Sequence, residues 1–204
     1  MRKVVDAATR TYHWLFAASF VGAYITADSE MFRLLHVTLG YTMIGLLVFR
    51  VLWGIVGPRQ MRLSAMFRKL QGFKGLVAAY RAGEWLQTPQ LKQSVNLLMT
   101  MVIVALLFAV IPLTLSGYVV FNELAGEWVE EIHEFFGEFM LYLVVMHLVM
   151  IAIVSVIRRS NLAKSMLTGY VAGTGPDLIK QDYKWVAVSM MAGVTVWMLW
   201  YMVV

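Results

Sequence analysis

The chain has 204 residues, of which 60% are hydrophobic and 14% charged, and its mean hydropathy is +0.71. This composition is typical of membrane proteins and is not that of a soluble domain. Cysteine is absent, which excludes disulfides, thiolate metal sites and the covalent cofactor attachment that a C-x-x-C-H motif provides.

Five apolar segments, separated by polar loops, are close to the length that crosses a membrane as helix. They cover residues 12–26, 34–56, 95–121, 135–157 and 185–204. A membrane-spanning helix needs about 20 predominantly apolar residues. We therefore predict an all-α membrane protein with one domain over residues 1–204. It would consist of a four-helix transmembrane bundle that binds a cofactor and a fifth, C-terminal transmembrane helix.

Two segments have a second interpretation. The first apolar segment is short and follows Arg2 and Lys3, so a signal peptide is the alternative. His13, Trp14 and the poor cleavage site TADSE favour a span. The loop of residues 57–93 contains a partly amphipathic, basic stretch, which either lies on the inner membrane surface against anionic lipid or is a solvated loop.

Basic residues concentrate on one side of the predicted membrane. They occur at the N-terminus, in the 57–93 loop and before the last segment: Arg2, Lys3, Arg10, Arg59, Arg62, Arg68, Lys69, Lys74, Arg81, Lys92, Arg158, Arg159, Lys164, Lys180 and Lys184. The other side carries mainly acids: Asp28, Glu30, Glu123, Glu127, Glu130, Glu131 and Glu134. Because Lys- and Arg-rich loops stay in the cytoplasm, we expect a multi-pass protein of the bacterial inner membrane, with a cytoplasmic N-terminus and a periplasmic C-terminus. The net charge of +5 is then a topology signal, and without a soluble basic domain a nucleic-acid partner is excluded.

The four histidines of the chain all lie at or inside these apolar segments. His133 and His147 share the fourth segment and are 14 residues apart, so on a helix they face the same way, about 21 Å apart along the axis. The orientation places His36 with His133 at an outer level and His13 with His147 at an inner level. Each level takes one histidine from the fourth segment and one from another segment. Two six-coordinate haems held between facing helices require this arrangement.

Glycines and arginines near the histidines support this interpretation. Gly40 and Gly137 each follow a histidine by four residues. A glycine one turn away on the same face leaves room for a flat macrocycle, although close helix packing is the alternative. Arg33 precedes His36 by three residues and Arg50 follows it by 14, so both are candidate partners of haem propionates. The alternative for Arg50 is to extend toward the cytoplasmic surface.

A proton relay is the main competing interpretation of the histidines. A relay would also require buried carboxylates, and the only acid within the predicted spans is Glu138, near the outer surface. Ionisable residues inside a membrane are costly and usually functional. Four histidines at two matched depths therefore favour cofactor ligation over a relay or simple packing.

Several stretches of the chain resemble a known family. The stretches are TRTYHWL, LLHVTLGY, RVLWGIVGPR, IHEFFGEFMLYLVVMH and NLAKSMLTG, and together they cover nearly the whole chain. The sequence is similar to prokaryotic di-haem membrane cytochromes b of the cytochrome b561 family, in the branch that includes the b-type subunits of nickel–iron hydrogenases. The resemblance implies that His13, His36, His133 and His147 are the axial ligands of two b haems.

The expected function is electron transfer between a periplasmic redox partner and the membrane quinone pool. The acidic outer loops favour a basic partner such as a c-type cytochrome, and a hydrogenase subunit is the other candidate. Membrane lipid, quinone and a second copy of the chain complete the expected partners. Two alternatives are a self-contained superoxide:quinone oxidoreductase, which the acidic outer face disfavours, and a membrane anchor whose histidines bind nothing.

Overall fold

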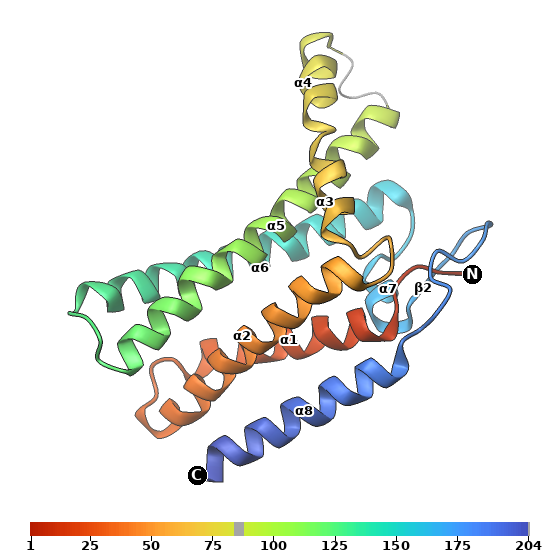
Figure 1. The fold of residues 1–204 in the computed structure, drawn as a ribbon. Coiled ribbons are helices and arrows are strands. Elements are labelled where there is room, and N and C mark those ends of the chain that lie inside the picture. Colours follow the sequence, from red (N-terminus) through yellow and green to blue (C-terminus); the bar gives the residue numbers. More distant parts are fainter. Residues whose placement is uncertain (84–87, 204) are drawn as a thin grey trace.

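The computed structural model describes residues 1–83 and 88–203. Within these residues the chain is mostly helical, with one two-stranded sheet (Figure 1). The helices are α1 (Ala7–Thr26), η1 (Glu30–Phe32), α2 (Arg33–Val56), α3 (Leu63–Leu70), α4 (Phe73–Arg81), α5 (Thr88–Phe121), α6 (Trp128–Arg158), α7 (Ala163–Thr168) and α8 (Lys184–Val203). The strands are β1 (Arg2–Lys3) and β2 (Tyr170–Val171), which pair antiparallel.

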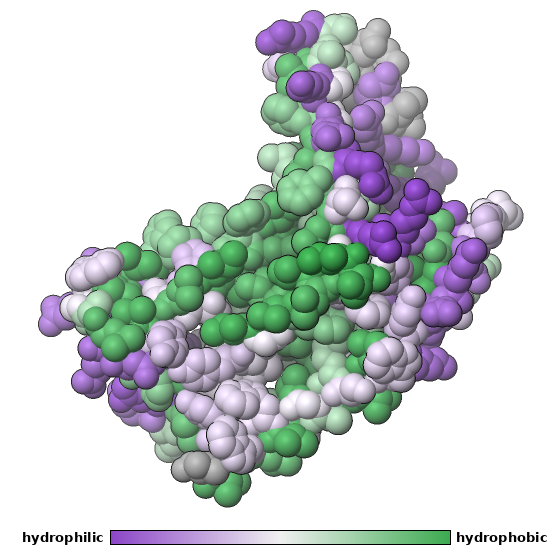
Figure 2. Space-filling view, viewed as in Figure 1, coloured by the Kyte–Doolittle hydropathy of each residue, from purple (hydrophilic) through white to green (hydrophobic). Residues whose placement is uncertain are grey.

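In the described part of the chain, four helices are long and apolar enough to cross a membrane. They are Glu30–Val56, Gln90–Phe121, Trp128–Arg158 and Lys184–Val203, which correspond to the last four predicted segments. Figure 2 shows apolar side chains over the middle of these helices and hydrophilic ones toward the ends of the molecule. The prediction of an all-α membrane protein is therefore confirmed. The first predicted span, residues 12–26, is not confirmed, because Arg10, His13 and several hydroxyl side chains make the first half of α1 too polar.

The long helices extend beyond the apolar segments that predicted them. α5 begins at Thr88 and α6 at Trp128, several residues before the predicted starts at 95 and 135. Glu130 and Glu131 lie in the first turn of α6, where carboxylates complement the positive end of the helix dipole. His133 consequently lies more than one turn inside α6, where its backbone is held by helical hydrogen bonds.

The membrane helices form two groups. α5 packs along α6, and α1 packs along α2, with α8 against α1 and α2 on the side away from α6 (Figure 1). The buried core joins the two groups through Phe20 of α1, Met43 of α2, Val110 of α5 and Met140 of α6. Met140 lies midway between His133 and His147 in the sequence, so this core forms an apolar layer between the two predicted histidine levels.

Residues 1–10 are held by residues 165–182, which lie between α6 and α8. We name these two segments together the N-terminal clasp. β1 pairs with β2, the backbone amides of Val4 and Val5 donate to the Gly169 carbonyl, and Asp182 accepts from Lys3 at 2.9 Å. Gly169 has a φ of +85°, and an added Cβ would lie 2.8 Å from the Val5 carbonyl oxygen. This close approach requires glycine at position 169.

The amphipathic stretch in the 57–93 loop forms α3 and α4. Figure 1 shows both helices packed beside the first part of α5, beyond the end of α2. They carry Arg68, Lys69, Lys74 and Arg81 together with exposed Phe67. Residues 84–87 of the predicted stretch lie outside the described residues, and its contact with the membrane surface stays a prediction.

Candidate functional site

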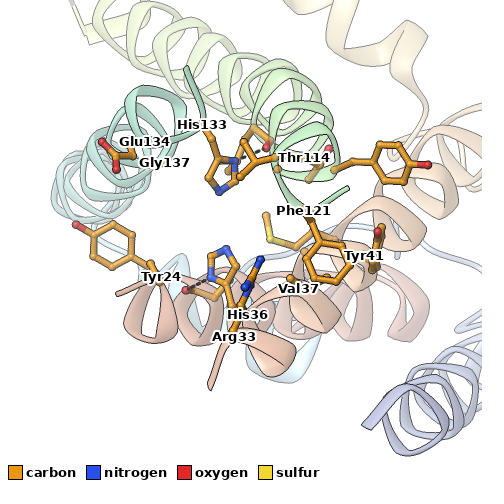
Figure 3. A pocket seen from close by; sticks show the side chains of 18 of the residues that line it. Tyr24, Arg33, His36, Val37, Tyr41, Thr114, Phe121, His133, Glu134 and Gly137 are labelled. Carbon is orange, nitrogen blue, oxygen red and sulfur yellow. Dashed lines mark hydrogen bonds between the residues drawn. The ribbon is translucent and has the colours of Figure 1, made fainter. Parts of the chain in front are cut away.

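The outer predicted pair is brought together by α2 and α6. The ring centres of His36 and His133 are 6.0 Å apart, and the ring planes are inclined at 79°. Figure 3 shows the two rings facing each other across a cavity, one from each helix. A metal–imidazole bond is about 2 Å long, so imidazoles on opposite sides of one metal ion have ring centres about 6 Å apart. The spacing therefore fits a metal ion between the two rings.

Both outer histidines are oriented by backbone carbonyls. Nδ1 of His36 lies 2.8 Å from the carbonyl oxygen of Ala23, and Nδ1 of His133 lies 2.9 Å from that of Leu113. A carbonyl can only accept, so each Nδ1 carries the proton and each Nε2 keeps its lone pair for a metal. Metal-binding histidines are commonly fixed in this way.

The Ala23 carbonyl is available because α1 ends at Thr26. The last four carbonyls of a helix have no partner within the helix, and Ala23 provides one of them. The Thr26 hydroxyl also donates to it, at 3.2 Å. The end of α1 thus provides the acceptor that orients His36 on the neighbouring helix.

The cavity between the outer histidines has a volume of about 710 Å³ and is lined from α1, α2, α5 and α6. This is within the range of about 300–1,000 Å³ typical of ligand pockets. Gly40, Gly137 and Arg33, the candidates chosen for their spacing to the histidines, all line it. A Cβ added at Gly40 would meet no atom within 4 Å, because the space beside it is the cavity itself.

Carboxylates surround the mouth of this cavity. Asp28, Glu30, Glu130, Glu134 and Glu138 line it, against Arg33 as the basic lining residue. Figure 3 places Glu134 and Gly137 on the α6 wall beside His133, with Arg33 on the opposite wall. The guanidinium carbon of Arg33 lies 5.9 Å from the centre of the Phe121 ring, which stacks the charge at the cavity edge.

The inner predicted pair is also brought together, by α1 and α6. The ring centres of His13 and His147 are 6.4 Å apart, with the planes inclined at 56°. This spacing again suits one metal ion between two imidazoles. Nδ1 of His147 is buried and has no hydrogen-bond partner among the described residues, whereas a buried polar atom usually has one.

The predicted arginines are placed differently. Arg33 lines the outer cavity together with His36 and His133, which is a suitable position for pairing with a haem propionate. That pairing stays a prediction. Arg50 donates to the Met61 carbonyl at 3.2 Å and contacts the Met66 sulfur at 3.4 Å. These contacts tie Arg50 to the loop and helix that follow α2. A role for Arg50 at the inner pair stays a prediction.

Sequence reasoning missed Gly117 of α5. A Cβ at this position would lie 2.8 Å from Cε1 of His133, so only glycine leaves the imidazole in its place. Ser116 adds a second contact to the same ring, with Oγ 3.3 Å from Nδ1. The sequence shows a glycine near the end of the third apolar segment, but it gives no indication that this glycine contacts a particular histidine.

Comparison with known proteins assigns these features to a family. A family model described as prokaryotic cytochrome b561 matches residues 4–169. No curated protein and no solved structure matches the chain. The matched residues include all four histidines, and α8 lies outside the match.

Proposed function

Because the chain belongs to the prokaryotic cytochrome b561 family and is a membrane b-type cytochrome, we propose that it transfers electrons between a periplasmic redox partner and the membrane quinone pool. The observation that carries this proposal is the meeting of His36 with His133 and of His13 with His147 at two levels, with α6 contributing to both. Two separate pairs provide two binding sites along one path through the membrane.

Each pair would hold one haem b by coordination from both faces. Haem iron with two imidazole ligands changes its charge by one electron and has no open position for another ligand. The residues of this chain orient the ligands: the Ala23 and Leu113 carbonyls fix two of the imidazoles, and Gly40 keeps the cavity wall free of side chains. Arg33 is the cation placed to pair with a haem carboxylate at the outer site.

The proposed arrangement in the bacterial inner membrane includes α1 as a spanning helix. Its 20 residues would extend about 30 Å, the thickness of a hydrocarbon core. α1 packs along α2, which is apolar enough to span. The loops rich in Lys and Arg support a cytoplasmic N-terminus and a periplasmic C-terminus for the single domain.

The carboxylates around the outer cavity support a basic partner. Five acidic residues line the cavity, and opposite charge speeds the approach of a partner and orients it. A c-type cytochrome with a basic face suits this surface, and a hydrogenase subunit is the other candidate from the resemblance. The same charges would repel superoxide, which disfavours the alternative of a superoxide:quinone oxidoreductase.

Paired substitutions test the proposal. We expect His36→Ala and His133→Ala to remove the same haem, and His13→Ala and His147→Ala to remove the other, measured as haem content and reduced-state absorption of the purified protein. Tyr142→Ala, at an exposed position of α6 between the two histidines, is the control and should retain both haems. Loss of different haems within one pair would overturn the pairing, and purified protein without haem would overturn the function.

The electron acceptor is tested separately. Reduced protein mixed with a quinone in detergent should be oxidised, and a basic c-type cytochrome should exchange electrons with it at a rate that falls as salt is raised. Rapid reduction by superoxide with no protein partner present would instead favour the alternative function.

A further inference from the structure

The two histidine pairs differ in what their second ring nitrogens contact. At the outer pair, both Nδ1 atoms donate to backbone carbonyls, at 2.8 Å for His36 and 2.9 Å for His133. At the inner pair, the Nδ1 of His147 is buried without a partner, and no hydrogen bond within residues 1–83 and 88–203 involves His13. Neither inner ligand therefore has a hydrogen-bond acceptor among the described residues.

This difference affects the electron density of the ligands. An imidazole that donates its Nδ1 proton to an acceptor is more basic at Nε2 and stabilises a more positive metal ion. Two such ligands on one iron favour its oxidised form. Two ligands without acceptors favour it less, so hydrogen bonding alone would give the two sites different reduction potentials.

Charge adds to the hydrogen-bonding difference. The outer cavity is lined by Glu130, Glu134 and Glu138 of α6, together with two further carboxylates. Negative charge beside a metal stabilises its more positive oxidation state. On the inner side, Arg10 lies three residues before His13 on α1 and is paired with Asp182 at 3.8 Å, so no comparable excess of negative charge is contributed by this pair. Because these residues are partly in water, their effect is screened, and the hydrogen bonds remain the primary cause.

Resting on the proposed function, we infer that the outer haem site has the lower reduction potential and the inner haem site the higher one. An electron would then pass from a haem held by His36 and His133, which would be oxidised, to a haem held by His13 and His147, which would be reduced, with no bond made or broken. The favoured direction is from the periplasmic partner inward. An electron moving inward opposes a membrane potential that is negative inside, and the potential difference between the sites offsets that cost.

A redox titration of the purified protein, followed by absorption, tests the order. Wild-type protein should show two one-electron midpoints. The haem that remains in His147→Ala should titrate at the lower midpoint, and the haem that remains in His36→Ala at the higher midpoint. The reverse assignment, or a single shared midpoint, would overturn the inference while leaving the two-haem function intact.

A second pair of variants leaves all ligands in place. Glu134→Gln removes a carboxylate that lines the outer cavity and should raise only the lower midpoint. Glu131→Gln removes a carboxylate from the same helix that does not line the cavity, and it should cause a smaller shift. A shift of the higher midpoint in Glu134→Gln would assign that midpoint to the outer site and overturn the inference. Protein that binds no haem would contradict the proposed function instead.

Discussion

The outer and inner histidine pairs share α6, yet the chain holds them by different means. The outer pair is oriented by carbonyls within the helical bundle, and it faces a cavity of about 710 Å³. The inner pair has no such acceptors among the described residues. It lies close to the N-terminal clasp, where Trp14 donates to the Met166 carbonyl at 3.0 Å. The positions of the outer rings therefore depend on the bundle, and those of the inner rings depend also on a loop outside it.

This contrast shows that equal spacing in a sequence does not give equal sites. His36 and Arg50, like His133 and His147, are separated by 14 residues, and the pattern predicts two similar levels. The surroundings come from other helices and loops, which have no such repeat. The site-specific chemistry therefore depends on neighbours that are distant in the sequence.

The largest expected effect is at Gly117 and should affect only the outer site. In Gly117→Ala the new methyl group would lie 2.8 Å from Cε1 of His133, which forces the ring away from the Leu113 carbonyl. Overpacking of this kind costs about 1–3 kcal/mol, and we expect most of the outer haem to be lost. Haem content and absorption of the purified protein measure this. Gly45→Ala is the control, because a Cβ there meets nothing within 4 Å.

Filling the outer cavity should separate haem binding from stability. In Gly40→Leu the side chain has free space in the protein without haem, so the thermal stability of that form should not fall. The outer haem should bind at least about tenfold more weakly, since displacing the added side chain costs more than about 1.4 kcal/mol. Gly193→Leu on α8, also in open space, should bind both haems normally. A lower melting temperature of haem-free Gly40→Leu would contradict the open cavity.

A change in the N-terminal clasp should affect the inner site more than the outer one. Burial of Asp182 opposes its ionisation, but its hydrogen bonds and charge interactions with Lys3, the Ala7 amide and Arg10 outweigh this and lower its pKa. Asp182→Asn should therefore reduce stability by about 1 kcal/mol. On heating, the inner haem should be released before the outer haem, as followed by absorption.

The same carboxylate predicts a pH dependence with a definite sign. The folded pKa of Asp182 lies below the unfolded value of about 3.9. Its contribution is present above that value and is lost as the pH falls through the folded pKa. The melting temperatures of wild type and Asp182→Asn should therefore converge in acid. A constant difference at all pH values would contradict this role.

The smallest expected effect is at Ser116. Its hydroxyl lies 3.3 Å from Nδ1 of His133, farther than the Leu113 carbonyl at 2.9 Å. Ser116→Ala should retain both haems, because the Leu113 carbonyl still orients the ring. The outer midpoint should move by less than in Glu134→Gln, and the inner midpoint should not move. Ser94→Ala is the matched control, since Ser94 donates to the Gln90 carbonyl as Ser116 donates to the Pro112 carbonyl, in both cases four residues earlier in α5. Loss of the outer haem in Ser116→Ala would show that the carbonyl alone is insufficient.

The sequence predicted the features that follow from local periodicity. Long apolar runs predicted four of the helices, and the histidines that were paired from loop charges and helical spacing lie close together in the structure. The polar first half of α1 left its span unconfirmed by hydropathy. α5 and α6 begin before the apolar spans predicted at 95 and 135, because polar turns continue a helix beyond its apolar run.

Contacts between distant segments could not be predicted. The Ala23 and Leu113 carbonyls have no side-chain signature, since every residue carries a carbonyl. Gly117 gains its role only from the position of α5 against α6. The strands of the clasp pair Arg2 with Val171 and have only two residues each. A strand of this length is too short to produce a recognisable sequence pattern.

The apolar layer between the two histidine levels has a consequence for the membrane as an insulator. Phe20, Met43 and Met140 are at most 5% exposed and fill the bundle between the outer and inner pairs. A proton needs a continuous row of water or polar groups to move, and packed hydrocarbon offers it no partner. An electron needs no such row. The layer would therefore let electrons cross the protein without letting protons through, so that the proton gradient across the same membrane stays intact.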